Sequence, residues 1–363
     1  MVMRRKLYLL ASVLLFHVGQ AGAETQSIIS NLANPAIGFN ALFRAEAVPK
    51  LSTPYGFRFE ESEVSLVSVV DQYWTLSSNL VFAPDGVDPE EVYAITQQIP
   101  GIQLKVGKFR ATLGKHGQLH THAFPFVEAP AILANTIGEE GFKDAGAEAG
   151  WLTPLPWYCE LTAGAYQAVG LDADHPMDLD GTSHTNIPCS GHLKNLLDLT
   201  DETTLELGGS GLTGMGNDSL HHTAWGADLT VRNVPLRQSN QRGWILQGEY
   251  LARVISGGGL REMDADGGYA SFQYRWAQAW WTGIRAEYAR HSTTDLLLQD
   301  GGLLGQVRKL SANVAWLPSE FSQIRAEYAV ARLEPDSGTG RFLDQRVMLQ
   351  MSFTIGFHPP HAY

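Results

Sequence analysis

Residues 346–357 read RVMLQMSFTIGF, and this stretch decides the fold. Every second residue from Val347 to Phe357 is apolar, whereas most residues between them are polar or small. Successive side chains of a β-strand point to opposite faces, so the alternation predicts a strand with one apolar face. The same period of two occurs at 225–232 and 309–316, where the polar face carries charge.

Sixteen strands of this kind are expected along the chain. Links after even-numbered strands are short, whereas most links after odd-numbered strands are longer and rich in Gly, Asp or Pro. Tight turns at one end and long loops at the other are typical of a transmembrane barrel, and a soluble sandwich has no physical reason to show them. The sequence therefore predicts an all-β fold: a transmembrane antiparallel up-and-down β-barrel of about 16 strands, with short periplasmic turns and long outer loops. The expected strands lie near 35–48, 57–70, 73–83, 88–98, 101–112, 145–153, 156–167, 191–199, 202–210, 222–232, 242–255, 267–276, 279–291, 307–317, 320–333 and 343–357. The longer links are 84–89, 114–144, 170–190, 256–266, 292–306 and 335–341.

The first 23 residues have the features of a secretory signal peptide. Arg4, Arg5 and Lys6 give a basic start, residues 7–18 a short apolar core, and residues 21–23 a small-residue cleavage site. Cleavage there removes these three basic residues and no acidic ones, so the net charge of −12 becomes −15. The expected organisation is a signal peptide (1–23), a short periplasmic segment (24–34) and a barrel (35–363) in the outer membrane of a Gram-negative-type bacterium.

Composition narrows the class further. Of the 363 residues, 44% are hydrophobic and only 18% are charged, which favours a folded chain over a disordered one. The acidic balance repels phosphate backbones, so no nucleic-acid partner is expected. Beyond the first 23 residues no apolar run approaches the roughly 18 residues of a membrane-spanning helix.

The hexapeptide IRAEYA occurs twice, at 284–289 and at 324–329. On a strand its Ile, Ala and Tyr share one face and its Arg and Glu the other. In a barrel the charged face would line a watery lumen, while the tyrosines would join an aromatic girdle. By the same alternation, the expected pore-lining residues are Lys105, Asp228, Arg232, Arg285, Glu287, Lys309, Arg325, Glu327 and Arg346.

The link 114–144 is the most distinctive segment outside the strands. A loop of this length either covers the mouth of a barrel or folds inward as a constriction. Its mixture of apolar and polar residues, with a short helix expected within 129–136, favours packing against the lumen wall. The residues expected to act in this constriction loop are His116, His120, His122, Phe126, Glu128, Glu139 and Glu140.

His120 and His122 form a candidate metal site. Alternate residues of a strand point the same way, so the two imidazoles would share a borderline ion such as zinc, with Glu128 or His116 as a third ligand. The alternative is that these histidines form hydrogen bonds within the loop or face the lumen without a metal. No other cofactor is expected.

The two cysteines test the strand map. Export to an oxidising compartment favours a Cys159–Cys189 disulfide. The map, however, separates them by up to the height of the barrel, and a disulfide needs Cα atoms within about 7 Å. The sequence therefore leaves the pairing open, with the strand map favouring free cysteines.

Several segments resemble a known outer-membrane family. They are LKVGKF (104–109), HTH (120–122), FVE (126–128), GEEG (138–141), WLTPLP (151–156), LELGGSGLTG (205–214) and GFHPPH (356–361). Together they are similar to bacterial barrels labelled zinc-regulated, TonB-dependent outer membrane receptors, and GKF (107–109) is similar to phosphate-selective porins. The label implies active import. Such a receptor needs a plug domain of roughly a hundred residues ahead of a 22-stranded barrel, for which residues 24–34 leave no room, so a pore without that coupling is expected.

The expected function is a porin-like channel for passive diffusion of small polar solutes or ions. The alternative is a non-conducting barrel that acts as a receptor or sleeve for a partner in zinc uptake or in an envelope complex. Ser, His and carboxylates occur without a catalytic signature, so no enzyme is expected. Outer-membrane lipid and small solutes are the expected partners, with a homotrimer and an envelope protein as further candidates.

Overall fold

The computed structural model describes residues 35–47, 56–96, 98–169, 175–182, 186–237, 241–291, 305–334 and 340–356. The expected signal peptide, the segment 24–34 and most of the link 292–306 lie outside the described residues. Sixteen strands, a six-residue helix and two short 3₁₀ turns make up the described elements. The strands are β1 (Ala36–Ala47), β2 (Gly56–Val69), β3 (Trp74–Ala83), β4 (Gly86–Thr96), β5 (Ile102–Arg110), β6 (Lys143–Leu152), β7 (Tyr158–Tyr166), β8 (Cys189–Thr200), β9 (Thr203–Met215), β10 (His221–Asn233), β11 (Gly243–Gly257), β12 (Leu260–Ala277), β13 (Trp280–His291), β14 (Gln306–Ser319), β15 (Ser322–Glu334) and β16 (Phe342–Gly356).

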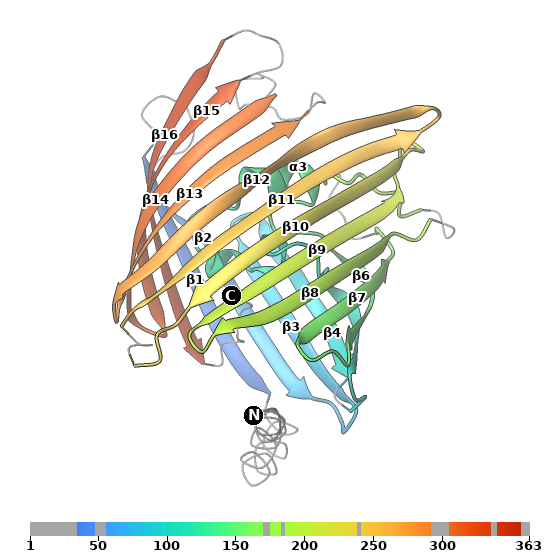
Figure 1. Ribbon diagram of the computed structural model, residues 1–363, viewed down its shortest axis with the longest axis horizontal. Coiled ribbons are helices and arrows are strands. Elements are labelled where there is room, and N and C mark those ends of the chain that lie inside the picture. Colours follow the sequence, from blue (N-terminus) through green and yellow to red (C-terminus); the bar gives the residue numbers. More distant parts are fainter. Residues whose placement is uncertain are drawn as a thin grey trace.

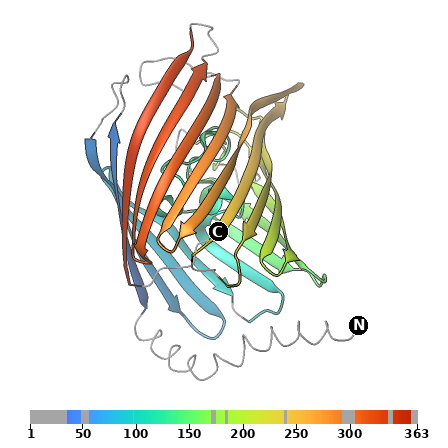
Figure 2. The ribbon, with the colours of Figure 1, turned by 60° about the vertical axis from the view of Figure 1, so that its left-hand side comes forward.

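Each strand pairs antiparallel with its neighbours in sequence, and the first strand closes the sheet on the last. Ala41 of β1 faces Ser62 of β2 on one side and Phe353 of β16 on the other. Figures 1 and 2 show the tilted strands forming one closed wall. The expected up-and-down barrel of sixteen strands is confirmed. Closure matters because hydrocarbon cannot satisfy the unpaired N–H and C=O groups of a sheet edge.

The wall has an apolar outside and a polar inside. In β16 the side chains of Val347, Phe353 and Ile355 are exposed, whereas Gln350 and Ser352 between them are buried. At the short-turn end, Trp276, Trp280 and Trp316 stack in a row, with ring centroids 5.6 and 6.1 Å apart. An apolar band bordered by aromatic rings is the surface that a bilayer requires of a barrel. The alternation in 346–357 therefore separates a lipid face from a bore face.

The two ends of the barrel differ as expected, with two corrections. The expected loop 256–266 is a tight hairpin: β11 continues to Gly257, β12 begins at Leu260, and Gly258 and Gly259 supply the positive φ angles of the turn. The expected link 84–89 is also tight, because β4 already begins at Gly86. Long strands thus replace the loops at these two positions.

Between β5 and β6 the chain leaves the wall and enters the bore. This constriction loop runs over residues 111–142, close to the expected 114–144. It contains η1 (His116–Gln118), η2 (Thr121–Ala123) and α3 (Ala131–Thr136), and α3 packs against β11, β12 and β13 from inside the barrel (Figures 1 and 2). Among the described residues, no helix is long and apolar enough to cross a membrane.

Candidate pore and constriction loop

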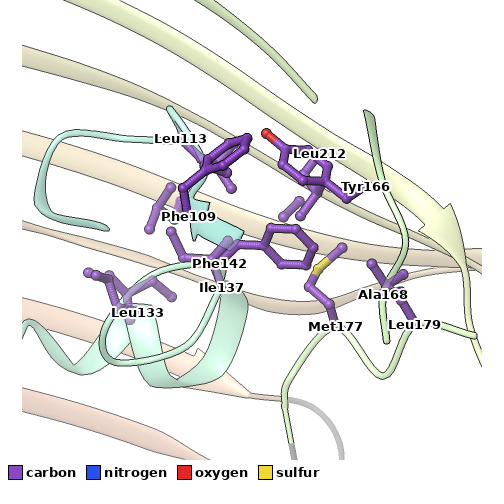
Figure 3. Packing of buried hydrophobic residues seen from close by; sticks show 14 of the residues in the cluster. Phe109, Leu113, Leu133, Ile137, Phe142, Tyr166, Ala168, Met177, Leu179 and Leu212 are labelled. Carbon is purple, nitrogen blue, oxygen red and sulfur yellow. The ribbon is translucent and has the colours of Figure 1, made fainter. Parts of the chain in front are cut away.

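One side of the constriction loop is apolar and forms the main core of the protein. Leu133, Ile137 and Phe142 of the loop are fully buried against Phe109 of β5 and Tyr166 of β7. Figure 3 shows Met177 and Leu179, from the link between β7 and β8, closing the same cluster. Each buried side chain of this size contributes about 1.5–3 kcal/mol, so the loop is held inside the bore by its own hydrophobic core.

The backbone of the loop is satisfied by carboxylates of the wall. The amides of Lys115 and His116 donate to the two oxygens of Glu249 on β11, at 2.9 and 3.1 Å. A loop has no strand partner for its N–H groups, and a buried unpaired N–H is costly, so carboxylates of the wall serve as acceptors. Val127 N–H donates to Glu327 and Ala131 N–H, at the start of α3, donates to Glu287, both at 2.8 Å.

This arrangement changes the role of several residues expected to line an open pore. Glu287 and Glu327 do face the bore, but the loop covers them. Arg285 is buried between Glu287, 2.8 Å away, and the ring of Phe126. Lys105 places its Nζ over the rings of Tyr93 and Phe109. Period-two alternation predicts which face a residue occupies, but it does not predict what covers that face.

Glu128 of the loop is held by three cations from three strands. Its carboxylate lies 2.8 Å from Arg44 of β1, 2.6 Å from Lys309 of β14 and 2.9 Å from Arg346 of β16. Burial opposes ionisation, but Lys309, Arg346 and Arg44 outweigh it and hold the pKa of Glu128 well below its ordinary value. We call these four residues the Glu128 clamp. Lys309 and Arg346 therefore line the bore, but they act there as loop anchors.

Further along the wall, at β2 and β4, His120 of the loop is surrounded by carboxylates. Its Nδ1 lies 3.1 Å from Glu63 of β2 and 3.1 Å from Glu90 of β4, and its Nε2 lies 3.0 Å from Glu91. Burial and Arg110 favour the neutral ring, but the three carboxylates outweigh them and raise the pKa of His120 well above its ordinary value.

A bulge in β4 brings both neighbouring glutamates into the bore. The register shifts between Asn79 and Leu80, so that Glu91 faces Asn79, Pro89 faces Leu80, and Glu90 is the extra residue. A bulge re-aims one side chain of a strand, and here Glu90 and Glu91 are both buried on the inner face. Sequence reasoning missed Glu63, Glu90 and Glu91, although consecutive acidic residues after a strand proline are a signal for such a bulge.

The third ligands expected for a His120–His122 metal site lie elsewhere. The ring of His122 is close to that of His120, with centroids 5.7 Å apart. His116 instead packs its ring against Phe124, at 4.4 Å between centroids, and burial followed by the nearby charge of Arg285 holds its pKa well below the ordinary value. Glu128 belongs to its own clamp. The groups that the structure places next to His120 are wall carboxylates, and neither His116 nor Glu128 is among them.

Two cavities lie on either side of the loop. The long-loop cavity, about 460 Å³, is lined by Glu128, Glu139, Glu140, Lys309 and other residues near the ends of the long links. The short-turn cavity, about 190 Å³, is lined mainly by strand ends near the short turns. Its lining includes Arg232, Gln273, Trp281, Asn313, Gln323 and Arg325. Phe124 lines both cavities and is itself buried, so its ring lies at the border between them.

The remaining site residues of the sequence analysis fall in the wall. Asp228 is buried on the inner face of β10. Cys159 and Cys189 are free, and Cys189 pairs in register with Ala165, six positions along β7 from Cys159. Six residues of strand span about 20 Å, which is far beyond the reach of a disulfide.

A closed barrel with an apolar outer surface is the architecture of outer-membrane proteins, which places the chain in the outer membrane of a Gram-negative-type bacterium. The chain matches no protein-family profile. It is 26% identical to an uncharacterized protein of Aquifex aeolicus, over 86% of this chain and 71% of that protein.

Solved structures with similar folds include outer-membrane porins and channels. OprB of Pseudomonas putida has a TM-score of 0.62 at 7% identity, covering 89% of this chain and 94% of that one. The anion-selective porin of Comamonas acidovorans has a TM-score of 0.60 at 8% identity, covering 89% and 99%, and the channel DcaP of Acinetobacter baumannii has 0.58 at 10%, covering 88% and 97%. At these identities the likeness shows a porin-like barrel; it does not show the zinc-regulated, TonB-dependent receptor family.

Proposed function

We propose that this chain is a passive outer-membrane channel for small polar solutes or ions, with the constriction loop as its narrowest part. The observation that carries this proposal is the pair of cavities with the ring of Phe124 at their border. One cavity lies toward the long links and the other toward the short turns, so a solute that crosses the bore would pass both of them and the ring of Phe124. Polar walls with charged groups are suited to hydrated solutes, and a side chain at the junction would set the size limit.

The charges of the short-turn cavity favour anions or neutral hydrogen-bonding solutes. Its described lining contains Arg232 and Arg325, together with the amides of Gln273, Asn313 and Gln323, and no carboxylate. Fixed positive charge in a narrow, low-dielectric passage raises the local concentration of anions. The anion selectivity named for the Comamonas porin is a property of that protein, and it makes the sign of selectivity the first property to measure here.

A specific observation also favours the second candidate, a sealed barrel that serves a partner protein. The loop is bonded to β1, β11, β13 and β16, so it is fixed across the bore and would keep a sealed barrel closed. The two candidates differ in what the purified protein does alone. A channel conducts without a partner, whereas a sleeve is closed until one binds.

The test is current recording across planar bilayers with the purified full chain. We expect the current to increase in steps of uniform size. In a KCl gradient, the reversal potential should shift toward the equilibrium potential of the anion. Membranes that contain folded protein but show no steps would contradict a passive channel and favour the sleeve. Resistance of the unheated protein to unfolding on an SDS gel provides the check that the barrel is folded.

A further inference from the structure

We propose that Glu63, Glu90 and His120 bind a divalent transition-metal cation of the zinc type, between the constriction loop and strands β2 and β4. The ligands come from both sides of this contact: His120 belongs to the loop, and the two glutamates belong to the wall. The proposal does not depend on whether the barrel conducts.

The ligand atoms are spaced as the corners of a metal site. The oxygens Oε2 of Glu63 and Oε2 of Glu90 each lie 3.1 Å from Nδ1 of His120, and the three ligand atoms lie within 4.8 Å of one another. With Zn–N and Zn–O bonds of about 2.0–2.2 Å, the corners of a tetrahedron are about 3.3–3.6 Å apart. A cation at the centre would therefore need only small movements of the side chains.

The approach of two carboxylates to one imidazole nitrogen supports a cation in this place. A proton on Nδ1 points in one direction and bonds well to one acceptor, whereas two carboxylate oxygens approach this nitrogen at the same distance. A metal bound to Nδ1 would contact both. Glu90 is already paired with Arg110 and Lys143, so the positive charge of the metal would chiefly offset that of Glu63, which is buried.

The groups around the ligands are arranged as the outer shell of a metal site. Glu91 lies 3.0 Å from Nε2 of His120, which makes the carboxylate–histidine–metal arrangement that fixes an imidazole in its ligating orientation. Ser65 donates to Oε1 of Glu63 at 2.8 Å, and Lys143 donates to Oε1 of Glu90 at 3.1 Å. Each glutamate therefore has one oxygen held by a neighbour and the other directed at the site.

The donor set indicates the class of cation. One imidazole and two carboxylates suit zinc and similar borderline ions, whereas calcium and magnesium prefer six or more oxygen ligands. Nδ1 of His122 lies 3.6 Å from Oε2 of Glu63 and is placed to serve as a fourth ligand. Binding would add a second cross-link between the loop and the wall, at β2 and β4, beside the Glu128 clamp on β1, β14 and β16.

The test is calorimetric titration of Zn²⁺ into the chelator-treated, detergent-solubilised full chain. We expect one site per chain, no comparable site for Mg²⁺, and at least tenfold weaker Zn²⁺ binding in His120→Ala and in Glu63→Gln with Glu90→Gln. His192→Ala is the matched control, because His192 is also buried on the inner face but lies on β8. Its affinity should equal that of the unaltered chain.

X-ray absorption at the zinc edge gives a second readout that does not depend on variants. A first shell of nitrogen and oxygen with imidazole scattering and no sulfur is expected. Binding below one equivalent, or affinity unchanged by His120→Ala in a chain with its full β-sheet signal, would overturn the proposal. Because these measurements need no ion flow, a failed metal site and a failed channel would be distinguished.

Discussion

Replacing Glu128 by Gln should loosen the constriction loop. Three cations from β1, β14 and β16 meet on this carboxylate, and charge-assisted hydrogen bonds contribute about 1.5–3 kcal/mol each. Gln keeps one oxygen as a neutral acceptor, so roughly two such contacts are lost. The cations retain other partners, including Glu46 and Asp344, which places the loss near the lower end, at about 3 kcal/mol.

A loss of about 3 kcal/mol corresponds to a roughly 100-fold rise in the equilibrium constant for release of this part of the loop. In single-channel recordings the variant should spend far more time at conductance levels above that of the unaltered chain. Glu139→Gln is the matched control, because Glu139 lines the same cavity and loses the same charge but is not part of the Glu128 clamp. Identical traces for Glu128→Gln and the unaltered chain, or equal effects of both variants, would refute the reasoning.

The pH dependence of this clamp follows from the lowered pKa of Glu128. A carboxyl whose pKa falls on folding contributes stability above its ordinary pKa of about 4.3, and the contribution is lost only as pH falls through the lowered value. The Glu128 clamp should therefore hold between pH 5 and 8, and the difference between Glu128→Gln and the unaltered chain should be constant over that range.

Three further results are expected. Phe124→Ala should join the two cavities and raise single-channel conductance several-fold, and unchanged conductance would exclude this ring as the barrier. Arg232→Glu should move the reversal potential in a KCl gradient toward cations, whereas an unmoved potential would show that the short-turn cavity does not select ions. Gly141→Ala should lower the unfolding temperature of the protein or the protection of the loop from proteolysis. Gly141 has a φ of +77°, and an added Cβ would lie 2.1 Å from the carbonyl oxygen of Gly117. A variant with unaltered stability would contradict the packing of this turn.

The wall of the barrel could be predicted from sequence because its rule is local. Phe353 faces lipid and Ser352 faces the bore, and a period of two places both without knowledge of any distant residue. The same rule places Arg285 and Glu287 on the inner face. The same rule explains why the prediction of a loop at 256–266 is wrong. β11 and β12 extend into this link, and the residue pattern does not change clearly at their expected ends.

The candidate site could be predicted only in part, because its contacts join residues far apart in sequence. Strand alternation predicts that His120 and His122 point the same way and share a metal ion, but His122 lies in a 3₁₀ turn. The partners of His120 come from β2 and from a bulge in β4, and no local pattern connects them to the loop. The apolar residues of the loop predict that it folds inward. The wall carboxylates that accept its hydrogen bonds can be identified only when the strand register of the whole barrel is known.

In the proposed channel, the constriction loop lies inside the bore and limits its width. Deleting Leu119–Ile137 and recording single-channel conductance in planar bilayers tests this most directly, with SDS-gel mobility confirming that the shortened chain still forms a barrel. If the loop sets the width of the bore, the deletion variant should show uniform steps several-fold larger than those of the full chain. A folded deletion variant with the conductance of the full chain would contradict this role of the loop.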